Sequence, residues 1–168
     1  MNATDVLRYG QLTLLGTLEG LDDDARDRPG ACGDWSVKDI FAHLASYELV
    51  LIDILGVEAG ERFDTPHLDH FVSVGPAFND AEVAARANAG LADVLTELGE
   101  AHGETLRLVA AISPERLREP GTLPWYGAEY AIDDLIVYQY CGHKREHAAQ
   151  VEAFRDHGSR LSQATSSC

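Results

Sequence analysis

The feature that most constrains the fold is the spacing of the apolar residues. They recur every three or four positions in four long stretches, and nowhere do they alternate with polar ones. Such spacing predicts helices with one apolar face, whereas alternation would predict strands. We expect the helices to cover residues 4–21, 36–57, 79–112 and 131–157. Helices of this length bury their apolar stripes best by packing together, so the sequence predicts an all-α fold, an antiparallel four-helix bundle.

Two of these helices have a recognisable beginning. Ser36 is followed three residues later by Asp39, which predicts a capping box in which each side chain binds the other residue's backbone N–H. Asn79 stands in a similar position before the third helix. The stretch 61–76 contains two prolines and a glycine, and we expect it to form a loop.

The length fits one domain. Of the 168 residues, we assign 1–158 to the bundle and 159–168, which are rich in polar residues, to a disordered tail. No apolar run is expected to span a membrane, and the polar start lacks the features of a signal peptide. The three cysteines are far apart and form neither a disulfide framework nor a metal-binding pair, so we expect a reducing, cytoplasmic location.

The charge of the chain excludes a class of partners. Acidic residues number 28 and basic residues 13, which gives a net charge of −15. Nucleic acids and anionic membranes are bound mainly through Lys and Arg, and they would repel this surface. We therefore expect a small-molecule substrate and neither nucleic acid nor membrane as partner.

Three histidines form the candidate metal site. His143 and His147 are four residues apart, so both imidazoles lie on one face of the fourth helix and can reach one point. Apolar residues continue that row at both ends, which places it toward the core. His43 lies in the apolar stripe of the second helix, where an imidazole needs a hydrogen-bond partner or a metal. Three neutral nitrogen ligands with an open position are typical of a catalytic metal site.

A second pattern overlaps the same residues. The segment 143–147 fits H-x-x-E-H, a metalloprotease signature. That signature needs a third ligand further along, and the short remainder of the chain makes it a poor fit. Glu146 is nevertheless close enough in sequence to His143 to act as an acid or base. We expect His67, His70 and His102 to lie at the surface.

These residues also carry a family resemblance. Residues 35–45, with the sequence WSVKDIFAHLA, resemble the second-helix signature of the DinB-like superfamily of metal-binding four-helix bundles. Residues 142–148, GHKREHA, resemble its C-terminal H-x-x-x-H signature, and the distance of about a hundred residues between the two also fits. The resemblance extends over nearly the whole chain, to about residue 157.

The resemblance implies one divalent metal, zinc or nickel, held by His43, His143 and His147. Members of the superfamily include S-transferases that use the thiols bacillithiol or mycothiol, and mycothiol-dependent maleylpyruvate isomerases. More distant relatives include a self-resistance hydrolase, and a homodimer is a common assembly for such bundles. The family motif fixes the metal but leaves the substrate open.

The residues around the histidines are candidates for chemistry and binding. Tyr47 and Gln139 each lie one helical turn from a predicted ligand, and Trp125 and Tyr126 lie in the loop before the fourth helix. We assign catalytic roles to Glu146 and Tyr47, and the binding of a thiol co-substrate to the other three.

Three functions fit this site. The first is a metal-dependent S-transferase that joins a thiol to a small electrophilic metabolite. The second is a hydrolase for self-resistance or detoxification that uses metal-activated water. The third is a bundle that binds a small molecule without catalysis. Neither the substrate, the thiol, the native metal nor the oligomeric state follows from the sequence.

Overall fold

The capping box before the second helix is formed as predicted. In the computed structural model, which describes residues 2–61 and 63–165, Asp39 N–H donates to Ser36 Oγ at 3.2 Å and Ser36 N–H donates to Asp39 Oδ2 at 2.9 Å. Helix α2 then extends over Val37–Glu58. Most of its side chains are buried, since it contacts α5, α8, α3 and α4.

The described residues form helices and no strand, which confirms the all-α prediction. The other α-helices are α1 (Ala3–Gly16), α3 (Pro66–Val74), α4 (Phe78–Ala85), α5 (Leu91–Ala111), α6 (Pro114–Leu117), α7 (Ile132–Leu135) and α8 (Gly142–Thr165). Two short 3-10 helices are η1 (Asp23–Ala25) and η2 (Gly75–Ala77), and a π-helix, η3, covers Ile136–Cys141.

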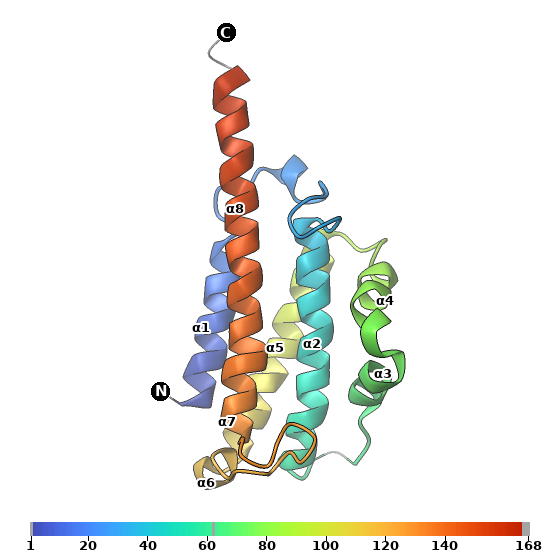
Figure 1. Ribbon diagram of the computed structural model, residues 1–168, viewed down its shortest axis with the longest axis vertical. Coiled ribbons are helices and arrows are strands. Elements are labelled where there is room, and N and C mark those ends of the chain that lie inside the picture. Colours follow the sequence, from blue (N-terminus) through green and yellow to red (C-terminus); the bar gives the residue numbers. More distant parts are fainter. Residues whose placement is uncertain (1, 62, 166–168) are drawn as a thin grey trace.

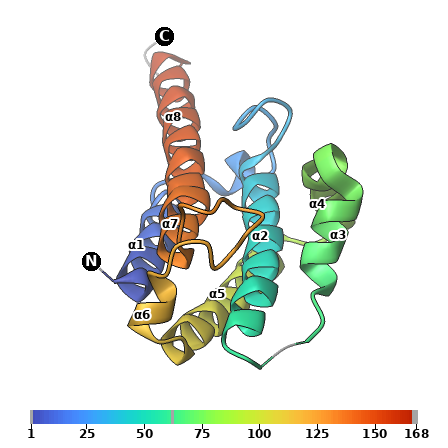
Figure 2. The ribbon, with the colours of Figure 1, turned by 60° about the horizontal axis from the view of Figure 1, so that its bottom comes forward.

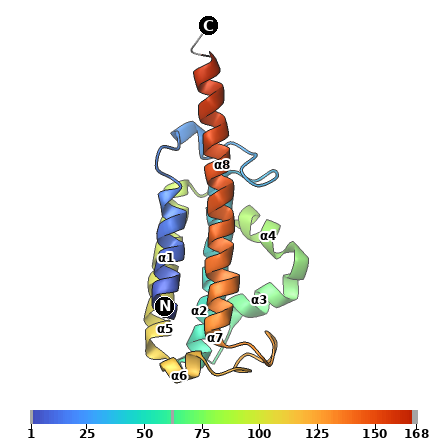
Figure 3. The ribbon, with the colours of Figure 1, turned by 60° about the vertical axis from the view of Figure 1, so that its left-hand side comes forward.

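Four long helices lie side by side. Figure 1 and Figure 3 show α1, α2, α5 and α8 along the long axis of the molecule, with α3 and α4 beside α2. Figure 2 shows the segment between α6 and α7 reaching toward α2. Two apolar clusters fill the interior. One contains Leu51, Leu55 and Leu108, and the other contains Phe41 and Leu98.

The third predicted helix is wrong in its boundaries. It is divided into α4 and α5, and α5 begins only after Gly90, whose N–H donates to Asp93 Oδ2 at 3.1 Å. Asn79 is not the N-cap, since it lies inside α4 and accepts a hydrogen bond from the Tyr47 hydroxyl at 3.2 Å. The first helix also ends earlier than predicted, at Gly16.

Part of the predicted loop 61–76 is helix α3. Asp53 of α2, which is fully buried, accepts the backbone N–H groups of His67 and Leu68 at 2.6 and 3.1 Å. The carboxylate thereby satisfies N–H groups that have no partner within the helix. Because the capping carboxylate comes from α2, this cap could not be predicted from the local sequence of residues 61–76.

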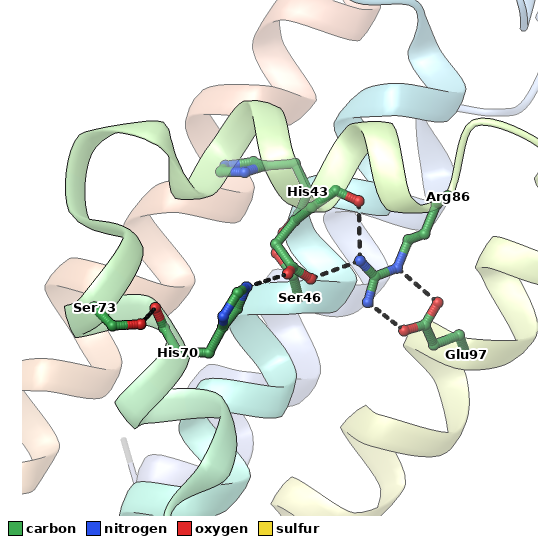
Figure 4. A network of polar contacts seen from close by, with 7 residues as sticks. His43, Ser46, His70, Ser73, Arg86 and Glu97 are labelled. Carbon is green, nitrogen blue, oxygen red and sulfur yellow. Dashed lines mark hydrogen bonds and ion pairs between the residues drawn. The ribbon is translucent and has the colours of Figure 1, made fainter.

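An ion-pair network fixes the position of α4 and α3. The Arg86 guanidinium binds Glu97 of α5 through two nitrogens, at 2.6 and 2.9 Å, and Glu82 at 2.7 Å (Figure 4). His70 of α3 contacts Glu82 at 3.2 Å. Two-point Arg–carboxylate pairs fix orientation as well as distance, so the network holds the α3–α4 arm against the bundle.

The fourth predicted helix is a continuous helical segment with an irregular start. In η3 the chain takes one wider turn, and the N–H of Gly142 donates to the carbonyl of Val137, five residues earlier. Helix α8 is described as far as Thr165, and residues 166–168 lie outside the described part. The domain boundary at 158 and the tail beyond it stay predictions.

Helix α2 is long and apolar enough to cross a membrane by length and composition alone, contrary to the expectation that no segment would be. Within the structure, 83% of its most apolar 18-residue window is buried. This is the pattern of a core helix, whose apolar residues face the neighbouring helices on several sides.

Candidate metal centre

Helices α2 and α8 bring the three predicted histidines together. The Nε2 atoms of His43 and His143 lie 2.9 Å apart, and those of His143 and His147 lie 3.0 Å apart. One ligand atom from each ring lies within 4.8 Å of the other two. Three Nε2 atoms thus point at one position, where they could hold a metal ion.

The surroundings of the rings keep them neutral. Burial, followed by the neighbouring rings of His143 and His147, lowers the pKa of His43 from 6.5 to about 3. Burial also lowers the pKa of His143 to about 4, aided by His147 and then Lys144. The pKa of His147 is lowered as well, mainly by burial. Near neutral pH each ring therefore has a lone pair to donate.

The ring nitrogens that face away from the centre differ in their partners. His147 Nδ1 lies 2.8 Å from Gln150 Oε1. An amide oxygen only accepts, so Nδ1 carries the hydrogen and Nε2 is left as the ligand atom. His43 Nδ1 is buried and has no hydrogen-bond partner among the described residues. Hydrogen bonding of the outer ring nitrogen orients metal-binding histidines, so Gln150 is a positioning residue that our sequence reasoning missed.

Aromatic rings enclose the His43 side. The rings of Trp35 and Tyr47 have centroids 5.1 and 4.8 Å from that of His43, and Tyr47 is also 4.8 Å from His143. Ser46 Oγ donates to the His43 carbonyl at 2.7 Å, one turn along α2 (Figure 4). The His43 ring is therefore held by packing, while Ser46 bonds to the backbone of the same helix.

The His143 side of the centre is open. A polar pocket of about 410 Å³ is lined by His143, Glu146, Tyr47 and Gln139, together with Tyr138 and Gly142. Glu146 and Gln139 are exposed, and Tyr47 is partly buried. Burial raises the pKa of Tyr47, so its phenol stays protonated. A ligand can therefore reach His143 past a carboxylate, a phenol and an amide.

Trp125 and Tyr126 lie in a neighbouring cavity. Both line an apolar chamber of about 220 Å³ that also includes Tyr47 and Gln139. The structure thus places all four predicted pocket residues around two adjoining cavities, although Trp125 and Tyr126 do not line the pocket that contains His143.

A second buried polar cluster lies on the other side of α8. Glu48 Oε1 binds His102 Nδ1 at 2.7 Å and Lys144 Nζ at 3.2 Å, and Lys144 also donates to Gln11 Oε1 at 2.9 Å. These residues come from α1, α2, α5 and α8. The prediction that His102 lies at the surface is wrong, because His102 is only 7% exposed.

Residues 11–132, well over half of the chain, match the family described as mycothiol maleylpyruvate isomerase N-terminal domain, a DinB-like superfamily domain. His43 lies inside the match, and His143 and His147 lie beyond it. No curated protein and no solved structure matches the chain. The extent of the match shows that the chain belongs to the family of mycothiol maleylpyruvate isomerase N-terminal domains.

Proposed function

We propose that the protein is a metal-dependent thiol S-transferase built on a DinB-like four-helix bundle. The observation that carries the proposal is the convergence of three neutral Nε2 atoms beside an open polar pocket. His43, His143 and His147 would hold a divalent cation, zinc or nickel. When bound, the cation would lower the pKa of a coordinated thiol.

The residues of the chain would position the thiol and accept its proton. Glu146 is the carboxylate at the pocket and would take the proton from the sulfur. The sulfur would then form a bond to an electrophilic carbon of the second substrate. The proton would pass to the substrate in an addition, or leave with the departing group in a displacement. Tyr47, protonated and beside His143, would donate a hydrogen bond to that substrate in place of the one that it donates to Asn79 Oδ1.

The lining of the pocket favours one of the two candidate thiols. Among the described residues, Glu146 is the charged side chain that lines the pocket, and a bound cation would offset its charge, so charge alone does not separate the two thiols. Mycothiol is a neutral sugar thiol whose hydroxyl groups suit Gln139 and Tyr138, and the family description also names mycothiol.

The experiment combines metal analysis with a thiol-dependent assay. Purified protein should contain about one divalent metal per chain, and His43→Ala and His147→Ala should lose it. With that metal bound, mycothiol and monochlorobimane should give a conjugate faster than without protein. His157→Ala, which changes an exposed histidine of α8, is the matched control and should behave like the unchanged protein.

The outcomes separate the alternatives. Unchanged metal content in both variants would mean that the three histidines do not hold the metal. Turnover that ignores the thiol would favour the hydrolase, and a co-purified ligand that stays intact would favour a binding protein. Homodimer formation, cytoplasmic location and the absence of nucleic-acid and membrane partners stay predictions.

A further inference from the structure

The apolar chamber beside the metal centre has a lining unlike that of the polar pocket. The chamber, of about 220 Å³, lies between α2, α3, η3 and the segment before α7. Its walls include the aromatic rings of Tyr47, Phe71, Trp125 and Tyr126. None of the described residues that line it carries a charge. A molecule inside would meet apolar surface and three kinds of polar group, which are phenols, the Trp125 indole N–H and the Gln139 amide.

The chamber adjoins the polar pocket of the candidate metal centre. Tyr47 and Gln139 line both the chamber and the pocket that contains His143. The Tyr47 ring lies 4.8 Å from the His143 ring on one side and 5.8 Å from the Phe71 ring on the other. The two cavities thus meet at Tyr47 and Gln139, so a substrate of modest length can occupy the chamber with one end while its other end lies beside His143.

The size of the chamber suits one ring with a short substituent. An apolar cavity of about 150 Å³ is enough to bind benzene in another protein. The rings that form the walls meet edge to face, at 72° between Tyr47 and Phe71 and 64° between Trp125 and Tyr126. Aromatic rings prefer this geometry with one another, so an aromatic guest has partners on both sides.

A way in from solvent is also present. Leu68, Phe71 and Trp125 line a second apolar groove, of about 430 Å³, which extends the chamber outward to Val72. Val72 and Trp125 are 70% and 59% exposed. The aromatic end of a substrate can therefore enter along α3, independently of the polar pocket through which the thiol would come.

The lining argues against an acidic substrate at this end. A carboxylate transferred into an apolar cavity without a cation or several donors is strongly destabilised. Lys144, the cation next to His143 in sequence, is buried and bound to Glu48 and Gln11 instead. Maleylpyruvate, which the family description names, is a dicarboxylate and finds no counter-charge in the chamber.

We propose that the second substrate of this protein is an uncharged electrophile with an aromatic or similarly flat apolar ring, which occupies the chamber while its reactive carbon faces the histidines. The inference rests on the proposed transferase for the reaction at that carbon. The binding of the ring stands on the chamber alone, so it can be tested without a thiol and without turnover.

The test is a titration of fluorobenzene, followed by its ¹⁹F NMR signal, into the protein as purified. We expect saturable binding to the unchanged chain. Leu68→Trp places an indole in the chamber from α3, a helix with no buried residue, and should weaken binding about tenfold or more. Leu12→Trp, at an exposed position on α1, is the matched control and should bind normally.

A second variant keeps the test decisive if Leu68→Trp disturbs α3. Trp125→Ala removes one exposed wall of the chamber and should also weaken binding of fluorobenzene. Absence of saturable binding, or equal affinity in both variants and the control, would overturn the proposal. A failed mycothiol assay with fluorobenzene still bound would overturn the transferase and leave the chamber in place.

A comparison of electrophiles completes the test in an active protein. With mycothiol, benzyl chloride should be conjugated with a kcat/KM at least about a hundredfold above that of chloroacetate, after correction for the reaction without protein. Leu68→Trp should reduce that ratio by lowering the value for benzyl chloride alone. A preference for chloroacetate in the unchanged chain would contradict an apolar substrate.

Discussion

The cluster of three histidines and the cluster around Glu48 contain neighbouring residues of the same helices but differ in how their polar groups are paired. His143 and Lys144 are adjacent on α8, and Tyr47 and Glu48 are adjacent on α2. The cluster around Glu48 contains a carboxylate and an ammonium group, which bind each other at 3.2 Å. The histidine cluster contains three neutral nitrogen ligands, and within the described residues their rings contact one another and Gln150 rather than a carboxylate.

The difference indicates which cluster is structural. Buried charges are tolerated when they are paired, and the Glu48 cluster has its pairs within the chain. The neutral imidazoles have no such charge pairing, and a cation between the three Nε2 atoms would bind their lone pairs. We therefore infer that the Glu48 cluster, whose charges are paired within the chain, holds the helices together. The histidine cluster, which lacks a charged partner, is the one that we expect to bind a ligand.

The largest expected effect comes from breaking the structural cluster. Glu48→Ala leaves Lys144 buried without its carboxylate and should lower the free energy of unfolding by about 3–5 kcal/mol. Metal bound per folded chain should stay the same. Urea denaturation and metal analysis of the folded fraction check both points. Glu152→Ala, at an exposed position of α8, is the control. A stable variant without metal would reverse the roles that we assign to the clusters.

Removing a ligand should give the converse result. His147→Ala should lower the affinity for zinc about a hundredfold or more, because two ligands remain of three. The free energy of unfolding of the metal-free protein should change by only about 1 kcal/mol, since a neutral ring with few partners is lost. Competition with a chromogenic chelator measures the affinity. An unchanged affinity, with a large loss of stability, would make the histidines structural.

The pH dependence of the metal-free protein tests the histidine cluster as well. Burial lowers the pKa of His43 to about 3 and of His143 to about 4, so the folded chain binds fewer protons than the unfolded one. The free energy of unfolding should therefore fall as the pH drops below 6.5, by up to about 1.4 kcal/mol per pH unit for each ring. Bound zinc should oppose this fall. His43→Ala should flatten the profile measured by urea denaturation between pH 6.5 and 4.

The sequence was informative where the signal was local. Ser36 and Asp39 lie in one turn, and the capping box they predict is formed. Helical periodicity on α2 and α8 was enough to predict that His43, His143 and His147 would face one centre. Short motifs around these residues also predicted that the chain belongs to the DinB-like superfamily.

What the sequence could not indicate depends on distant partners. Gly90 lies in the break between α4 and α5 and could have indicated it, whereas the pairing of Arg86 with Glu97 across that break was not predictable from the local sequence. His102 lies four residues after Leu98 on the buried face of α5, so periodicity could have placed it inside, but its partner Glu48, 54 residues away, was not predictable. The wide turn before Gly142 differs from an α-helix in its hydrogen bonds. The composition of the segment is that of an ordinary helix, so the sequence did not indicate the turn.

The smallest predicted effect concerns Gln150, because changing it tests the orientation of the His147 ring without removing a metal ligand. Gln150→Leu keeps the size of the side chain but removes the oxygen that accepts from His147 Nδ1. Loss of such a partner lowers metal affinity about tenfold in other proteins, because the ring is no longer held in one tautomer and orientation. We expect the same loss for zinc here, with metal content at saturation unchanged, and Gln150→Glu should restore the affinity since its carboxylate also accepts.

Glu152→Leu is the control for an added apolar side chain on α8. Equal affinity in Gln150→Leu and the unchanged chain would mean that packing alone orients the ring, as it does for His43, whose Nδ1 has no partner among the described residues.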